Sequence, residues 1–119
     1  MELKEPEASI FLKTSDGFVR LFLDDILYAE AFDHTTMLQT SSKCIEATTS
    51  IGALEPLLGR SFFRCHRSYL VEINQVLEIS KTGVTMSNGK IIPLSRRRYR
   101  SMEKALSIVG FKEQVTADN

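Results

Sequence analysis

The chain has 119 residues, 43% of them hydrophobic and 25% charged, which favours one compact soluble domain and excludes two independent ones. It has no apolar run near the roughly 20 residues of a membrane span, no signal-peptide character at its acidic N-terminus, and only two cysteines, which lack disulfide or metal-site patterns. The net charge is zero, but residues 1–59 hold four Lys/Arg against ten Asp/Glu, whereas residues 60–104 hold ten against three. We therefore expect a reduced, cytoplasmic protein whose second half is either a solvated surface or a footprint for phosphates.

The first half of the chain alternates β-rich runs with turn signals. A Ser-Asp-Gly turn joins a first predicted hairpin, and Ser41-Ser42 separates the strands of a second. The expected strands cover residues 9–14, 17–23, 26–32, 36–40 and 43–49.

A short helix is predicted at about residues 50–58. Thr49 or Ser50 can serve as its N-cap, and Gly59 ends it. Pro56 keeps this helix short or kinked. Its predicted apolar stripe consists of Leu54, Leu57 and Leu58.

Strand character returns in the second half at residues 62–66, 70–80 and 84–95, the last run with a hairpin turn at Asn88-Gly89. A final helix follows at about residues 96–108. We expect it to be capped by Ser95, to end at Gly110, and to face the sheets through Tyr99, Met102, Leu106 and Val109.

These elements predict a mainly β fold of small packed antiparallel sheets with one short helix and a C-terminal helix. The domain should cover residues 8–109. Residues 1–7 are expected to be a flexible N-terminal segment, and residues 110–119 a C-terminal tail.

Basic residues crowd one end of the strand at 62–67. Strand alternation places one set of side chains, Phe62, Arg64 and His66, on one face, and the other set, Phe63, Cys65 and Arg67, on the opposite face. Arg67 could stand beside the final helix and read guanine. Arg64 is expected either to share that role or to be packed against a carboxylate, and a structural hydrogen bond is the favoured role for His66.

The start of the final helix carries Arg96, Arg97, Arg98 and Arg100. Cations there oppose the helix macrodipole, so helix stability alone would not select them. Helical spacing points Arg97, Arg100 and Lys104 away from the apolar stripe. The cluster is either an anion-binding surface or a solvated face with unusually many arginines.

Catalytic interpretations are weak. Cys65 and His66 are neighbours on a strand and should point to opposite faces, which excludes a nucleophile–base pair. Asp24-Asp25 is typical of a turn, and the six glycines form no phosphate loop. We therefore predict no enzymatic activity, no cofactor and no metal.

Three motifs together resemble the LytTR family, the DNA-binding domain usually found at the C-terminus of bacterial response regulators. FFRCHRSYLV at 62–71 is similar to that family's F-x-R-x-H-R-S-(Y/F)-x-V pattern. SNGK followed by IPLSR within 87–96, and ILYAEA at 26–31 before a polar loop, also match. The resemblance extends from about Ile10 to Leu106, and it implies a compact β fold whose loops, not a recognition helix, enter DNA.

The resemblance also implies which positions contact DNA: the loop after ILYAEA, the end of the HRS segment, and the segment after Ser-Arg. On this chain these are His34, Thr35, Thr36, Met37, Arg67, Ser68, Arg97, Arg98 and Arg100. Two positions depart from the family. Glu72 replaces a common Asn, which would alter a turn-ordering hydrogen bond, and Thr36 stands where a larger base-reading side chain is found. No receiver domain precedes the match, so the chain is either a fragment of a longer regulator or a stand-alone one.

The leading hypothesis is sequence-specific double-stranded DNA binding by a transcriptional regulator, with the isolated domain monomeric and two copies on promoter direct repeats that bend the duplex. The alternative is a protein–protein interaction module whose basic face meets an acidic partner. RNA binding ranks third, because most of the seven Phe residues lie in core-patterned runs and no aromatic platform is evident.

Overall fold

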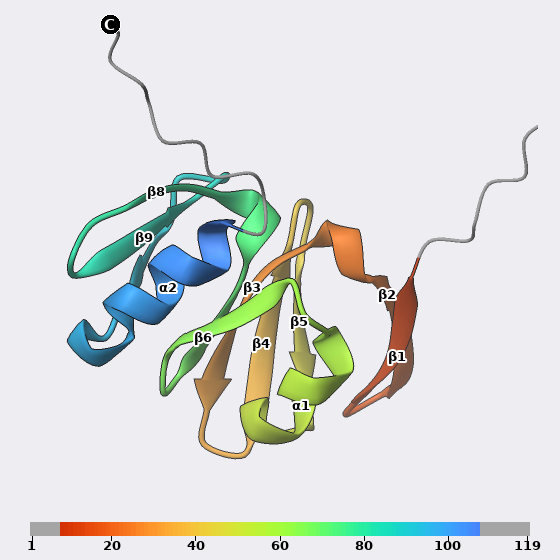
Figure 1. Ribbon diagram of the computed structural model, residues 1–119. Coiled ribbons are helices and arrows are strands. Elements are labelled where there is room, and N and C mark those ends of the chain that lie inside the picture. Colours follow the sequence, from red (N-terminus) through yellow and green to blue (C-terminus); the bar gives the residue numbers. More distant parts are fainter. Residues whose placement is uncertain (1–7, 108–119) are drawn as a thin grey trace, which may run out of the picture.

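The structure is a computed structural model that describes residues 8–107 (Figure 1). These residues form ten strands in three antiparallel sheets, with two α-helices. The mainly β fold predicted from the sequence is confirmed. The predicted N-terminal segment, the C-terminal tail, and the helix end at Val109 and Gly110 lie outside the described residues.

Most strands pair with a strand that is adjacent to them in the sequence. A two-stranded sheet pairs β1 (Ser9–Thr14) with β2 (Gly17–Phe22). The five-stranded sheet has the order β5-β4-β3-β7-β6, made of β3 (Ile26–Phe32), β4 (Thr35–Thr40), β5 (Cys44–Ala47), β6 (Phe62–His66) and β7 (Tyr69–Glu72). The three-stranded sheet has the order β10-β9-β8, made of β8 (Val76–Ile79), β9 (Gly83–Met86) and β10 (Ile91–Pro93).

The five-stranded sheet lies between two hydrophobic cores because successive side chains of a strand point to opposite faces. On one face, Leu38 and Leu70 pack with the inner residues of the β1–β2 hairpin and with α1. On the other face, Val71 packs with the three-stranded sheet and with α2 through Met102. Figure 1 shows the resulting order, with the hairpin on one side of the central sheet and α2 with β8 and β9 on the other.

Helix α1 (Ile51–Leu58) begins and ends where the sequence indicates. The Ser50 hydroxyl accepts a hydrogen bond from the Ala53 N–H at 3.3 Å, and Gly59 adopts a φ of 92°, a conformation that favours glycine. The predicted stripe is wrong at Leu57, which is 55% exposed. Ile51 takes its place in the core, because at about 100° per residue Ile51, Leu54 and Leu58 share one side of the helix.

The β-rich run at 70–80 is broken by a 3-10 helix, Ile73–Gln75, which passes the chain from β7 to β8 and so from one sheet to another. Glu72 orders this break. The residue is only 3% exposed, and its carboxylate accepts hydrogen bonds from the Asn74 N–H at 2.7 Å and the Ser61 hydroxyl at 2.9 Å. The departure from the family pattern at this position therefore supplies a turn-ordering bond, and the donors offset the cost of burying the carboxylate.

The final helix starts differently from its prediction. Arg96–Arg98 form a 3-10 turn, and the α-helix proper, α2, runs Tyr99–Leu106. Ser95 occupies the N-cap position, but its side chain makes no cap bond; its carbonyl accepts from the Arg98 N–H at 2.9 Å. Tyr99, Met102 and Leu106 pack on the second core as predicted. Within residues 8–107, no helix is long and apolar enough to cross a membrane.

Candidate nucleic-acid interface

The turn between β6 and β7 is shaped by a β-bulge. Arg64 pairs with Leu70 and His66 pairs with Tyr69, which leaves Cys65 as the extra residue. Cys65 and Tyr69 both belong to the second core, and the His66 ring meets the Tyr69 ring edge-on at 5.8 Å. The prediction that His66 shares a face with Arg64 is therefore wrong: the bulge turns His66 to the face of α2.

Arg64 lies on the opposite face and holds the turn in place. Its Nη1 forms an ion pair with Glu55 of α1 at 3.0 Å. Its Nε donates to the carbonyl oxygens of His66 at 3.2 Å and Arg67 at 3.1 Å. Of the two roles left open for Arg64, the carboxylate-paired one is confirmed. Because the guanidinium fixes both carbonyls, Arg67 extends into solvent from a turn with little freedom.

Two backbone hydrogen bonds join this turn to its neighbours. The Ala31 N–H donates to the Ser68 carbonyl at 2.8 Å, next to the end of β3. The Ser95 N–H donates to the Cys65 carbonyl at 2.9 Å, immediately before the arginine turn. The β3–β4 turn, the β6–β7 turn and the start of α2 consequently lie at the same lower end of the molecule in Figure 1.

A hollow of about 520 Å³ opens between the β6–β7 turn and the start of α2. It is lined by His66, Arg67, Ser95, Arg97, Arg98 and Ser101. The only ion pair within residues 8–107 is Arg64–Glu55, so the three arginines of the hollow have no carboxylate partner among the described residues. An unneutralised cluster of guanidinium groups in a concavity favours a phosphate or a base edge rich in acceptors.

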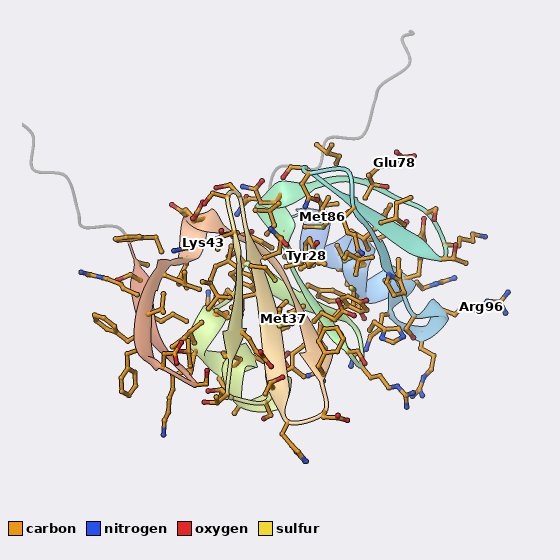
Figure 2. All side chains as sticks on the ribbon, turned by 180° about the vertical axis from the view of Figure 1, so that it is seen from behind. Tyr28, Met37, Lys43, Glu78, Met86 and Arg96 are labelled. Carbon is orange, nitrogen blue, oxygen red and sulfur yellow. The ribbon has the colours of Figure 1, made fainter. Side chains whose placement is uncertain are left out.

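The arginines of the final helix separate into two groups. Arg97 and Arg98 face the hollow, whereas Arg100 lines a second depression with Lys104 on another side of the helix. Arg97 and Arg98 belong to the 3-10 turn, whereas Arg100 belongs to the first turn of α2. Figure 2 shows Arg96 at the edge of the molecule, pointing outward.

His66 contributes a donor to the hollow. Its Nδ1 accepts a hydrogen bond from the Ser68 N–H at 3.1 Å, so the proton of the neutral imidazole resides on Nε2. The sequence identified the structural bond but missed this second role, and it also missed Ser95 and Ser101 as lining residues. His66 reaches the hollow because of the bulge in β6. The bulge depends on how β6 pairs with β7, so the local sequence does not indicate it.

The β3–β4 turn presents a polar tip. Asp33 adopts a φ of 50°, which short polar side chains tolerate. His34 is exposed at the tip. Thr35 is half-buried, and its hydroxyl donates to the Phe32 carbonyl at 3.1 Å. The turn is thus closed by its own hydrogen bond and carries one freely accessible ring.

The next two residues of β4 are less available. Thr36 is fully buried, and its hydroxyl donates to the Thr49 carbonyl at 2.7 Å, so its side chain is out of reach of a duplex. Met37 is half-buried and lies over the opposite face of the sheet (Figure 2), in a shallow depression shared with Phe32. The expected contact from Thr36 therefore does not fit its burial.

The buried thiol of Cys65 is not a nucleophile. The bulge places Cys65 and His66 on the same face, which removes the geometric reason given above for excluding a pair. Burial, however, raises the pKa of Cys65 to about 12, and its Sγ donates to the Pro93 carbonyl at 3.6 Å, so the thiol stays protonated near neutral pH. Among residues 8–107, no group of His, Cys, Asp and Glu is arranged to hold a metal ion.

Comparison with known proteins supplies the context for this surface. The sequence model of the LytTr DNA-binding domain matches residues 16–107. The sensory transduction protein LytT of Bacillus cereus is 28% identical over 103 residues, and the protein of the same name from Bacillus anthracis is equally similar. These matches cover 82% of this chain but 42% of the relatives, so the chain spans less than half of their length.

A solved structure shares the architecture. It is the LytTr DNA-binding domain of a methyl-accepting/DNA response regulator from Bacillus cereus, with a TM-score of 0.72 and 29% identity. The match covers 89% of this chain and 100% of that domain. The three-sheet fold described above is therefore that of a LytTr domain.

Proposed function

This chain belongs to the LytTR family of DNA-binding domains, and from that premise we propose that it binds double-stranded DNA sequence-specifically as part of a transcriptional regulator. The observation that supports the proposal most directly is the hollow at the end of the central sheet. It combines Arg67, exposed on an anchored turn, with Arg97 and Arg98, and no described carboxylate neutralises them. Such a surface attracts phosphates and can place one guanidinium against a base edge.

The proposed contacts divide by role. Arg67 reads a base, because it is exposed and its turn is anchored by Arg64. Arg97 and Arg98 bind backbone phosphates next to that base, and the Nε2–H of His66 donates a hydrogen bond to one of these phosphates. The remaining contacts from the family positions are His34, Thr35, Met37, Ser68 and Arg100; Thr36 is left out because it is buried.

Selection of bound sequences from a random duplex pool tests the proposal. A consensus should emerge, and specific duplex should compete far better than random duplex. An empty selection would favour the alternative, an interaction module whose basic face meets an acidic protein, because salt dependence alone cannot separate these two partners.

Two substitutions separate base reading from phosphate binding. Arg67→Ala should cost about 1–3 kcal/mol on the selected site and relax discrimination at one base pair. Arg100→Ala should weaken selected and random duplex equally and flatten the salt slope by about one unit. Uniform loss in both variants would make Arg67 a phosphate contact and place the base reader elsewhere.

We also propose that two copies, each monomeric without DNA, bind direct repeats about one helical turn apart and bend the duplex between them. Spacing by whole turns puts both copies on one face of the DNA, where a shared bend couples them. Inserting about five base pairs, roughly half a turn, should weaken joint occupancy in gel-shift titrations, and inserting about ten should cost less. Equal occupancy at all three spacings would show independent binding.

A further inference from the structure

The outer face of the β1–β2 hairpin carries three exposed phenylalanines. Phe11 is 65% exposed, Phe18 69% and Phe22 41%. These residues lie in runs that the sequence analysis described as core-patterned, but their side chains are outside the core. The strand register places all three on one side of the hairpin, because Phe11 lies opposite Arg20 and Phe22 lies opposite Ser9.

These rings contribute little to the core. The inner side of the hairpin supplies Ile10, Leu12, Val19 and Leu21 to the first core, and the outer side faces solvent. Polar residues would satisfy the strand alternation equally well at these positions. A cluster of aromatic side chains on one solvent-facing sheet surface marks an interaction site more often than it serves the fold.

Arg20 stands in the middle of the cluster in a fixed orientation. Its guanidinium carbon lies 5.6 Å from the Phe11 ring centre and 5.3 Å from that of Phe22. Its Nε donates to the Ser9 hydroxyl at 2.9 Å. The two terminal nitrogens make no bond to another described residue, so a bidentate donor is held between apolar walls at small entropic cost.

The charges of this surface select the kind of partner. Lys13 and Arg20 are its charged residues, and no carboxylate projects from the same side of β1 or β2. Two copies meeting through this surface would bring like charges together, which disfavours self-association. Arg20 already covers one face of two of the rings, which leaves a poor platform for stacking nucleic-acid bases.

We propose that the outer face of the β1–β2 hairpin, defined by Phe11, Lys13, Phe18, Arg20 and Phe22, docks a protein segment that carries a carboxylate beside an aromatic or aliphatic side chain. The carboxylate binds the guanidinium of Arg20, and the apolar side chain packs against the phenylalanines. Aromatic residues and arginine are the side chains that dominate binding energy at protein interfaces. The site is independent of DNA binding, because the hairpin lies across the central sheet from α2 (Figure 1).

A random twelve-residue peptide library, panned against the purified chain, provides the probe. Enriched peptides should pair Asp or Glu with a large apolar residue. Addition of a synthetic consensus peptide should shift the backbone amide resonances of residues 9–22. Arg20→Ala and Phe18→Ala should each weaken binding about tenfold or more, and amidation of the peptide carboxylate should do the same.

Leu77→Ala is the matched control, because Leu77 is also 69% exposed but lies on the three-stranded sheet. It should bind the peptide like the unsubstituted chain. All three positions are exposed, so the variants should fold, which unfolding curves monitored by circular dichroism will verify. Enrichment of peptides without acidic residues, or binding that survives Arg20→Ala, would overturn the proposal.

Three further outcomes would assign the surface to a different occupant and also overturn it. A dT12 or U12 oligonucleotide that binds and is lost in Phe18→Ala would identify single-stranded nucleic acid. A dimer in sedimentation that Phe18→Ala dissociates would identify a second copy. A chain lacking residues 1–7 that binds the peptide about tenfold more tightly than the full chain would identify the chain's own N-terminal segment.

Discussion

Arg64 is predicted to act on DNA binding without touching DNA. Substitution by alanine removes an ion pair to Glu55 and the two bonds from Nε to the carbonyls of His66 and Arg67. A hydrogen bond to a charged donor is worth about 1.5–3 kcal/mol, but solvent screens this site, where the Arg64 side chain is 21% exposed and that of Glu55 43%. We expect Arg64→Ala to lower the free energy of unfolding by about 2–3 kcal/mol.

The same substitution should weaken DNA binding. A loosened turn leaves Arg67 to be ordered on binding, and ordering a long side chain costs about 0.5–1.5 kcal/mol. Affinity for the selected duplex should therefore fall by roughly two- to tenfold. Urea denaturation measures the stability, and fluorescence anisotropy with a labelled duplex measures the affinity, at one fixed salt concentration.

Two controls separate the contributions of Arg64. Glu55→Gln removes the ion pair but leaves the carbonyl contacts, so it should cost at most about 1 kcal/mol of stability and leave DNA affinity unchanged. Arg64→Lys keeps the charge but cannot reproduce the geometry of the guanidinium, and it should behave like alanine in DNA binding. Full DNA affinity in Arg64→Ala, or an equal loss in Glu55→Gln, would refute the argument that Arg64 holds the turn.

Three other predictions concern side chains that the fold buries wholly or in part. Glu72→Ala should lower the free energy of unfolding by about 2–4 kcal/mol in urea titrations, because it leaves buried donors without an acceptor, whereas Glu72→Gln should cost less. Burial and a hydrogen bond to Glu30 raise the pKa of Tyr69 to about 12, so the folded state keeps a proton that the unfolded state loses near pH 10. Stability should therefore fall as pH rises between about 10 and 12, with a smaller slope in Tyr69→Phe. A thiol reagent should modify exposed Cys44 in the folded protein but buried Cys65 only on unfolding, and equal rates would contradict this burial.

The local signals in the sequence were sufficient for most elements of the fold. Strands, hairpins and the first helix depend on alternation, turn residues and caps that act over a few positions. Ser50 and Gly59 mark the ends of α1 because each satisfies a local backbone requirement. The resemblance added the identity of the fold, which such short β elements do not specify by themselves.

The errors occur where the answer depends on distant parts of the chain. The bulge at Cys65 follows from how β6 pairs with β7, and it reverses the face of His66 relative to simple alternation. Leu57 is apolar and correctly spaced, but the side of α1 that is buried is set by the sheet beneath it. The exposure of Phe18 is a similar case, because alternation shows two faces and cannot say that one of them stays uncovered.

The two cores explain how one small domain can present separate surfaces. The turn that carries Arg67 is held from the first core by Arg64 and Glu55 and from the second by the bond between Ser95 and Cys65. The β1–β2 hairpin packs only on the first core, on the far side of the sheet from α2. No described side chain links the outer face of the hairpin to the arginine hollow. We therefore expect that occupation of one surface leaves the geometry of the other unchanged, so that the two proposed partners, a protein segment and a duplex, do not compete.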